Sequence, residues 1–273
     1  MKMKKILVCE DEDAIREFEV ITLRRAGYEV IDASCGEDAI KYFEAAPNDF
    51  SVVLLDVMMP GIDGFTVCQR IRKQNSNVGI IILSAKSQEM DKVNGLMLGA
   101  DDYITKPFSP SELTARVDAI CRRIAIVPEN THNDLLVSGP FTLNLLSRTL
   151  TKNGTPIDLT QVEFQLMELF MNNEGTALER KNILVRIWGE SYNGDDKIVD
   201  VNIRRLRMKI EEEPSNPAHL QTVWGFGING WHNIRRLILS GRRTPEWQLK
   251  RLQNAGFSTA SALSLLFLLR LKL

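Results

Sequence analysis

Residues 52–64 read Val-Val-Leu-Leu-Asp-Val-Met-Met-Pro-Gly-Ile-Asp-Gly, an apolar run that ends in an acid and a turn. Four consecutive apolar residues, two of them β-branched, suit a central strand of a parallel sheet that is buried on both faces. Asp56 closes this strand, and Pro60, Gly61 and Gly64 then break the regular backbone. Ligands of open α/β sheets bind beyond the carboxyl ends of the strands, so Asp56 stands where chemistry is expected. Taken alone, this aspartate would more simply start a turn.

Three other predicted strands also end in polar groups, and parallel strands would bring all four ends to one edge of the sheet. The groups are Glu10 and Asp11 after strand 6–9, Ser84 after strand 79–83, and Lys106 at the end of a short strand within 100–108. Clustered carboxylates repel one another. Mg²⁺ suits such a pocket because it takes one or two carboxylates together with water and phosphate oxygens. Asp56 can then act as a nucleophile toward phosphorus, while the cation and Lys106 stabilise the transferring group.

These motifs together resemble the receiver domain of a two-component response regulator. The matching segments, in the family's order and spacing, are the Glu10-Asp11 pair, Asp56 with 58–61, Ser84-Ala85 and 106–108. Each motif is weak alone, but the combination is specific. The resemblance implies that a sensor histidine kinase phosphorylates Asp56.

The same resemblance implies roles for the other pocket residues. Asp11, Asp56 and the backbone carbonyl of Met58 would bind Mg²⁺, with Glu10 acting through water. Ser84 would move toward the phosphate while Tyr103 turns inward. Such a protein is not an enzyme for external substrates, and it catalyses at most its own phosphoryl transfer and dephosphorylation.

Length and composition favour a two-domain protein with no membrane segment. The 273 residues are 44% hydrophobic and 25% charged, which is ordinary for a globular protein. The four cysteines lack Cys-x-x-Cys spacing and are interpreted as reduced core thiols, and the three histidines are too scattered for a zinc site. The apolar stretch 6–9 is too short for a signal peptide, so we expect a cytoplasmic protein.

Residues 1–124 alternate between strand and helix patterns and are predicted to form the receiver domain. The predicted helices cover 14–27, 36–46, 64–74, 91–98 and 109–124, with an apolar strand before each. Five βα units of this kind predict an α/β fold, a doubly wound five-stranded parallel sheet with flavodoxin-like strand order.

Charged residues mark one face of this domain, formed by the fourth and fifth helices and the strand between them. They include Lys92, Asp102, Glu112 and Arg116. A charged face is usually just solvated, since single exposed ion pairs contribute well under ~1 kcal/mol. In regulators of the OmpR/PhoB type, however, this face forms a symmetric dimer after phosphorylation. The resemblance suggests cross-subunit pairs Lys92–Glu112 and Asp102–Arg116 in a homodimer.

Residues 125–134 lose periodicity and are predicted to link the receiver to a second domain at 135–232. Short strands are expected at 135–137, 141–145, 148–152 and 155–159, with Asn153-Gly154 as a hairpin turn. Thr160 and Glu163 have the spacing of a capping box at the start of a helix. Two more helices are expected near 179–188 and 197–212, followed by a strand and turn at 220–227.

The order of these elements fits a winged helix-turn-helix whose third helix enters the major groove of DNA. Segments 159–164, 199–207 and 222–227 resemble the OmpR/PhoB effector domain. By that resemblance, Asn202, Arg204, Arg205 and Lys209 are candidates for contact with double-stranded DNA, and loop 189–196 is a candidate contact for RNA polymerase. A plain solvated basic face is the alternative for the third helix.

The C-terminal end departs from the family pattern. Gly227 is followed by Ile228-Asn229-Gly230-Trp231, without the family's tyrosine, which puts DNA binding by the wing in doubt. Residues 233–273 add a basic tail whose apolar end is too short to span a bilayer, which needs about 20 residues. An added helix, an interfacial amphipathic anchor and out-of-frame sequence without a selected function remain open, and we favour the last or a poorly ordered tail.

The sequence therefore predicts a transcription regulator that is activated by phosphorylation, dimerises, and binds tandem or palindromic promoter sites. A phosphatase or hydrolase of α/β fold would also use Asp56, but it leaves the second domain unexplained. A receiver whose second domain binds protein is the other alternative. The operator, the regulated genes, the stimulus and the sign of the regulation are not encoded in any recognisable motif.

Overall fold

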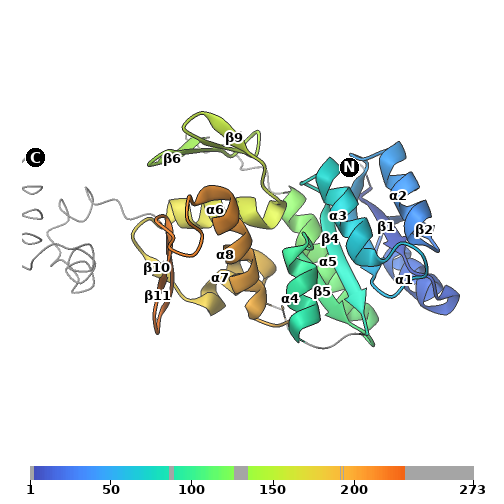
Figure 1. Ribbon diagram of the computed structural model, residues 1–273. Coiled ribbons are helices and arrows are strands. Elements are labelled where there is room, and N and C mark those ends of the chain that lie inside the picture. The colour runs from blue at the N-terminus through green and yellow to red at the C-terminus, as the bar shows by residue number, and fades with distance from the viewer. Residues whose placement is uncertain (1–2, 86–88, 126–134, 191, 193, 231–273) are drawn as a thin grey trace, which may run out of the picture.

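The computed structural model describes residues 3–85, 89–125, 135–190, 192 and 194–230 (Figure 1). We call residues 3–125 the receiver and residues 135–230 the effector. Of the predicted linker, only Ala125 is described, and it ends helix α5. The predicted tail at 233–273 lies outside the described residues.

The receiver is built around a parallel sheet of five strands in the order β2-β1-β3-β4-β5. The strands are β1 (Lys5–Cys9), β2 (Glu29–Ala33), β3 (Phe50–Asp56), β4 (Gly79–Ser84) and β5 (Asp102–Thr105). The prediction of a doubly wound sheet with flavodoxin-like order is confirmed. Strand β3 is central and buried throughout most of its length, as the apolar run before Asp56 predicts.

Five helices cover the two faces of this sheet (Figure 1). They are α1 (Asp13–Arg25), α2 (Gly36–Ala45), α3 (Gly64–Gln74), α4 (Glu89–Met97) and α5 (Pro110–Ala125). Successive strand residues point to opposite faces, and the apolar side chains accordingly divide into two clusters. Val52 and Leu54 pack with residues of α1 and α5, whereas Val53 and Leu55 pack with residues of α2 and α3.

The effector begins with a four-stranded antiparallel sheet and continues with three helices and a hairpin. Its elements are β6 (Leu135–Ser138), β7 (Phe141–Asn144), β8 (Thr149–Lys152), β9 (Thr155–Ile157), α6 (Gln161–Asn172), β10 (Ala177–Leu178), α7 (Arg180–Trp188), α8 (Lys197–Ile210), β11 (Leu220–Val223) and β12 (Gly227–Gly230). Thr160 and Glu163 form the predicted capping box at the start of α6. The sequence pattern does not reveal β10, because its two residues are too few to display a period.

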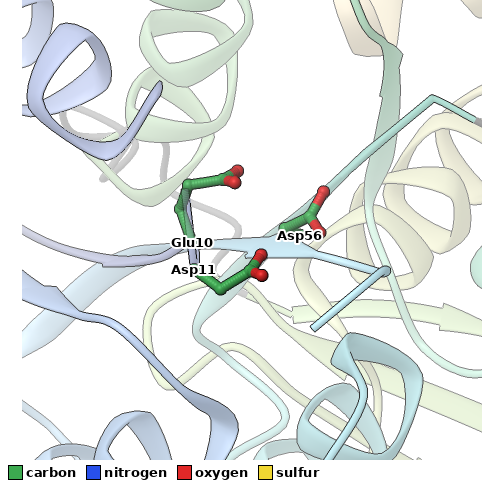
Figure 2. A group of neighbouring side chains, drawn as sticks. All are labelled: Glu10, Asp11 and Asp56. Carbon is green, nitrogen blue, oxygen red and sulfur yellow. The ribbon is translucent and has the colours of Figure 1, made fainter. Parts of the chain in front are cut away.

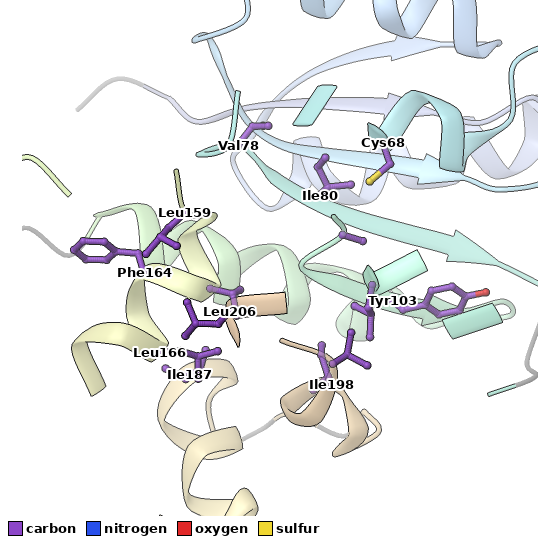
Figure 3. Close-up of a cluster of buried hydrophobic side chains, with 14 of the residues drawn as sticks. Cys68, Val78, Ile80, Tyr103, Leu159, Phe164, Leu166, Ile187, Ile198 and Leu206 are labelled. Carbon is purple, nitrogen blue, oxygen red and sulfur yellow. The ribbon is translucent and has the colours of Figure 1, made fainter. Parts of the chain in front are cut away.

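A single apolar cluster joins the receiver to the effector. It runs from Ile80 and Tyr103 in the receiver to Ile198 and Leu206 on α8 (Figure 3). Helix α8 packs against α4 along this seam. The two parts therefore share a hydrophobic core in this arrangement.

Candidate functional site

Three carboxylates meet at the carboxyl end of the receiver sheet (Figure 2). Glu10 and Asp11 directly follow β1, and Asp56 is the last residue of β3. One oxygen from each lies within 4.8 Å of the others. Glu10 and Asp56 are buried, while Asp11 is partly open to solvent. The expectation that parallel strands bring these acids together is met by the geometry.

Lys106 joins this group from the segment after β5. Its Nζ lies 2.6 Å from Glu10 Oε2 and 2.7 Å from Asp56 Oδ1. Burial acts to lower the pKa of Lys106, but the hydrogen bonds and charges of Asp56 and Glu10 outweigh it and raise the pKa. Burial raises the pKa of Glu10, and the bond to Lys106 only partly offsets this. Lys106 is thus held as a cation between two acids.

The backbone after β3 holds Asp56 in place. The amide of Met58 donates to Asp56 Oδ2 at 2.7 Å, while the Met58 side chain points to solvent. Gly64 starts α3 so close to β3 that a Cβ there would lie 2.0 Å from the Asp56 carbonyl oxygen. Position 64 therefore requires glycine. From the sequence alone, Gly64 was interpreted only as a residue that ends regular structure.

Ser84 and Tyr103 lie side by side on the neighbouring strands β4 and β5. Both are buried, and burial raises the pKa of Tyr103 while a hydrogen bond with Ser84 acts in the opposite direction. Tyr103 is therefore already inward in this structure. The expected movement of these two side chains remains a prediction.

The donor set fits a hard divalent cation. Three carboxylates offer only oxygen, and a small ion that keeps several waters can share such a site with a phosphoryl group. The single positive charge of Lys106 leaves the acids uncompensated, which favours a further cation. The chain thus carries an acidic cluster whose oxygen donors suit a cation such as Mg²⁺.

Glu19, on α1, is a buried acid behind this pocket that the motifs do not signal. Neither of its carboxylate oxygens has a hydrogen-bond partner in the described part of the protein. Burial, reinforced by the charges of Glu10 and Asp56, raises the pKa of Glu19 to about 8. In the sequence, the burial of Glu19 is indicated only by its position on the apolar side of helix α1.

The candidate DNA contacts on α8 lie in different environments. Asn202 is 0% exposed and donates through Nδ2 to the Ile198 carbonyl at 2.8 Å. Arg205 is 6% exposed, and its Nη1 donates to the Ala100 carbonyl of the receiver at 2.9 Å. Arg204 is exposed. In this arrangement the receiver covers part of the helix surface that was expected to read DNA.

A buried acid in the effector holds two of the cations expected to contact DNA. Glu163 Oε1 lies 3.2 Å from Arg205 Nη2, and its Oε2 lies 2.6 Å from Lys209 Nζ. Burial acts to raise the pKa of Glu163, but the charges of Arg205 and Lys209 outweigh it and lower the pKa. Glu163 therefore has a second role beyond the capping box, and the sequence spacing gives no sign of it.

The predicted dimer face is engaged within the chain. Arg116 Nη1 lies 3.1 Å from Asp102 Oδ1, and Arg116 Nη2 lies 3.0 Å from Glu112 Oε1. Tyr192 covers this group, because its hydroxyl donates to Asp102 Oδ1 at 3.1 Å and its ring centroid is 4.4 Å from the Arg116 guanidinium carbon. Lys92 lines a cavity of about 270 Å³ beside it. The pairs expected across subunits would need Tyr192 to leave.

Further polar bonds fasten the effector to the receiver. Trp188 Nε1 donates to the Asp101 carbonyl at 3.5 Å, and Gln161 Nε2 donates to the Asn77 carbonyl. Loop 189–196, the candidate polymerase contact, contains Tyr192, and residues 191 and 193 lie outside the described set. Contacts between parts so far apart in the chain leave no local trace in the sequence.

Two known families match separate parts of the chain. Residues 6–118 match the response regulator receiver domain, and residues 154–228 match the C-terminal domain of transcriptional regulatory proteins. The fold and the acidic pocket thus define a two-component response regulator with a winged-helix DNA-binding domain.

Relatives of known name extend over most of the chain. It is 42% identical over 226 residues to the sensory transduction protein RegX3 of Mycolicibacterium smegmatis, which covers 82% of this chain and 98% of that protein. It is 43% identical over 230 residues to the probable transcriptional regulator ycf27 of Cyanophora paradoxa, with 82% and 95% covered. A solved structure of a RitR mutant matches with a TM-score of 0.66 and 25% identity, covering 84% of this chain and 100% of that one. The chain belongs to the OmpR/PhoB-type response regulators.

Membership in this family makes the protein a transcriptional regulator and not a classical enzyme. Among the described residues, none of the helices combines the length and the apolar character that a membrane crossing requires.

Proposed function

We propose that a sensor histidine kinase phosphorylates Asp56 in the cytoplasm and that phosphorylation frees the effector to bind promoter DNA as a homodimer. The observation that carries this proposal is the convergence of Asp56 with Glu10, Asp11 and Lys106 at the end of the sheet. An aspartate that only formed a turn would not need a partly buried lysine beside its carboxylate oxygens. In phosphoryl transfer, by contrast, a lysine beside the accepting aspartate stabilises the charge of the transferred group.

The pocket supports the transfer as follows. An Asp56 carboxylate oxygen attacks phosphorus, and the bond between phosphorus and the donor's imidazole nitrogen breaks, so that the imidazole recovers a proton. Lys106 neutralises charge on the phosphoryl oxygens, and the Ser84 hydroxyl can donate to one of them. Asp11, Asp56 and the Met58 carbonyl would hold Mg²⁺, with Glu10 acting through water. This ion supplies further charge neutralisation when bound.

The covered dimer face connects phosphorylation with output. Strand β5 carries Asp102 and Tyr103 and leads directly to Lys106, so a rearrangement around Lys106 acts on the residues that Tyr192 covers. Closure by the effector and pairing of two receivers require the same surface. These two states are therefore mutually exclusive, and phosphorylation favours pairing by a difference in free energy between them.

Once released, the effector would present α8 to a major groove. Asn202, Arg205 and Lys209 would exchange their present partners for DNA, and Arg204 is available from the start. Two effectors held by a receiver dimer would bind tandem or palindromic half-sites. Loop 189–196 would become accessible to RNA polymerase at the same moment.

One experiment tests the proposal and its alternatives. The protein is incubated with acetyl phosphate and Mg²⁺, assayed for acid-labile phosphate, and then used in gel shifts on a fragment of its own promoter. Asp56→Asn should take up no phosphate, and Asp63→Asn is the matched control, because Asp63 caps α3 outside the pocket. Phosphate uptake by Asp56→Asn would contradict the mechanism.

The other outcomes identify the alternatives. Sustained turnover of an external phosphate ester would point to a phosphatase. Phosphorylation of Asp56 without any phosphate-dependent shift of DNA would contradict a DNA-binding output and favour a protein-binding one.

A further inference from the structure

Two sulfur atoms lie in contact beside the phosphorylation pocket. Cys9 ends β1, directly before Glu10, and Met59 is the third residue after β3. The Cys9 thiol lies 3.4 Å from Met59 Sδ, and the same thiol lies 3.4 Å from the Cys35 carbonyl oxygen. Cys9 is 1% exposed and Met59 is 7% exposed. A thiol, a thioether and a carbonyl thus converge on one buried point.

The single proton of the Cys9 thiol cannot serve both of its acceptors. It is donated either to Met59 Sδ or to the Cys35 carbonyl, and a thiol is a weak donor to both. A metal ion in place of the proton would take electron pairs from all three atoms at once. The three atoms therefore suit a small cation better than a proton.

Apolar packing accounts for Cys68 better than for Cys9. Free cysteines are commonly buried as small hydrophobic residues, and methionines commonly fill gaps in cores. Cys68 fits this description, because its thiol has only a long contact of 3.9 Å with the Leu98 carbonyl oxygen. At Cys9, two electron-pair donors face the same thiol at 3.4 Å, an arrangement that packing does not require.

The backbone around the three donor atoms is held by close contacts. The Glu10 amide donates to the Ala33 carbonyl at 3.1 Å, which joins the end of β1 to the end of β2. A Cβ at Gly36 would lie 2.4 Å from the Ile62 carbonyl oxygen, so the segments after β2 and β3, which carry the other two donors, pack directly against each other. The fold therefore positions the donors before any ion binds, as a metal site requires.

We propose that Cys9, Met59 and the Cys35 carbonyl form a binding site for a soft monovalent metal ion such as Cu⁺. Thiolate and thioether sulfurs select Cu⁺, whereas hard cations such as Mg²⁺ take oxygen ligands. The ion replaces the thiol proton, which leaves to solvent, so the net charge of the buried point does not change. A divalent ion would bring an additional charge between the two buried sulfurs, which is costly.

Cys35 connects this site with solvent. It is partly exposed at the N-terminal end of α2, whereas the two sulfur donors are buried. Burial and, after it, the charge of the neighbouring Cys35 thiol raise the pKa of Cys9, so the two thiols lie close together. Soft ions pass between sulfur ligands by exchange. The Cys35 thiol can therefore receive an ion from solvent and pass it to Cys9.

An ion at this site would act on the phosphorylation pocket through the backbone. Metal–thiolate bonds are about 2.3 Å long, so two sulfurs in a trigonal arrangement lie about 4 Å apart. The sulfurs of Cys9 and Met59 are 3.4 Å apart, so the ion pushes them apart. Met59 adjoins Met58, whose carbonyl is the proposed Mg²⁺ ligand and whose amide bonds to Asp56. The soft ion should therefore weaken Mg²⁺ binding, a consequence that rests on the proposed function, whereas the sulfur site does not.

The first test measures Cu⁺ binding by the full chain in competition with the colorimetric chelator bicinchoninate, in the absence of oxygen. We expect the wild type to bind one ion and Cys9→Ala to bind none. Met59→Leu, which conserves volume, should bind at least about tenfold more weakly, since even an outer-shell partner of a metal contributes that much. Cys68→Ala is the matched control at another buried cysteine and should bind like the wild type.

Cys35→Ser distinguishes the carbonyl of this residue from its thiol. The variant keeps the carbonyl and should bind Cu⁺ as tightly as the wild type. X-ray absorption at the copper edge should show two sulfur neighbours in both proteins, and circular dichroism checks that every variant is folded. Equal binding by the wild type and Cys9→Ala would overturn the site. Loss of binding in Cys35→Ser would also overturn it, because the ion would then sit on the Cys35 thiol.

A calorimetric titration with MgCl₂ tests the effect on the pocket. We expect Mg²⁺ to bind about tenfold more weakly to the copper-loaded wild type than to the copper-free protein, while added Cu⁺ leaves the Mg²⁺ affinity of Cys9→Ala unchanged. Equal Mg²⁺ affinities of the two wild-type forms would overturn the coupling. A copper-free wild type that binds no Mg²⁺ would instead contradict the proposed function and leave the sulfur site standing.

Discussion

The phosphorylation pocket and the DNA-reading surface are organised by different kinds of contact. Each pocket residue lies at the end of a strand or directly after it, so the sheet itself brings Glu10, Asp56 and Lys106 together. The reading surface depends on what packs against α8, and here Arg205 is buried and bonded to the Ala100 carbonyl of the receiver. A site built by neighbouring strand ends is fixed by the fold. A surface shared between two parts of the chain depends on how those parts are arranged.

The largest predicted change in folding stability comes from replacing Glu19. This change tests whether the buried acid behind the pocket is protonated. Its pKa of about 8 keeps Glu19 protonated when folded, whereas in the unfolded chain it ionises above about pH 4.3. The folded pKa is the higher one, so the wild type loses stability as pH rises from about 4.5 to about 8. Glu19→Leu should remove this loss and be more stable by roughly 3–5 kcal/mol at pH 8.

Urea unfolding at pH 5, 7 and 8.5 measures this difference. Glu17→Leu is the matched control, because Glu17 is an exposed acid on the same helix. A stability gain for Glu19→Leu that does not grow with pH would contradict the assignment of a buried, protonated carboxyl.

Lys106→Met tests the pocket directly. With the cation gone, Asp56 loses its 2.7 Å partner and the transferring phosphoryl loses a neutralising charge. We expect the rate of phosphorylation by acetyl phosphate to fall about 10²-fold. Lys41→Met, at an exposed lysine on α2, should react at the wild-type rate. Similar rates for both variants would show that Lys106 only supports the fold.

Tyr192→Ala tests the closed arrangement. It removes a hydrogen bond to Asp102 and a ring stacked on Arg116, which together contribute about 2 kcal/mol. The open form should become roughly 30-fold more populated relative to the closed one. Small-angle scattering should report a larger radius, and dimers should form at lower protein concentration after phosphorylation. Tyr42→Ala, on α2, should do neither.

Arg207→Ala should have the smallest effect of the four. It tests how firmly β11 is attached to α8 within the reading surface. Its two hydrogen bonds to β11 are partly open to water, so their loss should cost about 1 kcal/mol. Amide hydrogen exchange in β11 should accelerate about fivefold, while Arg204→Ala leaves it unchanged. Unaltered exchange in Arg207→Ala would mean that the hairpin is positioned by β10 alone.

Sequence reasoning predicted what local pattern and strand order determine. The order of the receiver sheet, the convergence of Asp56 with Glu10 and Lys106, and the capping box at Thr160 follow from apolar periodicity and from residue spacing. The element boundaries in the structure differ from the predicted ones by only a few residues, because Gly, Pro and capping residues mark them.

The features that were missed depend on packing between distant segments. Arg205 bonds to Ala100 across 105 positions and Tyr192 bonds to Asp102 across 90. The sequence around these residues does not predict such distant partners. The pairing of Asp102 with Arg116 was expected, but between subunits, and the structure forms it within one chain. Their opposite charges predicted that Asp102 and Arg116 would pair. Charge alone could not predict whether the pair forms within one chain or between two subunits.

The apolar seam between α4 and α8 makes the resting state dependent on temperature. Separation of the two parts would wet side chains such as Ile198 and Leu206, which are buried here. Exposure of apolar surface carries a positive heat-capacity change, and the attraction that closes such a seam weakens on cooling. Cold should therefore loosen the closed form before any phosphate arrives, so the protein's basal output would vary with the temperature of the cell that contains it.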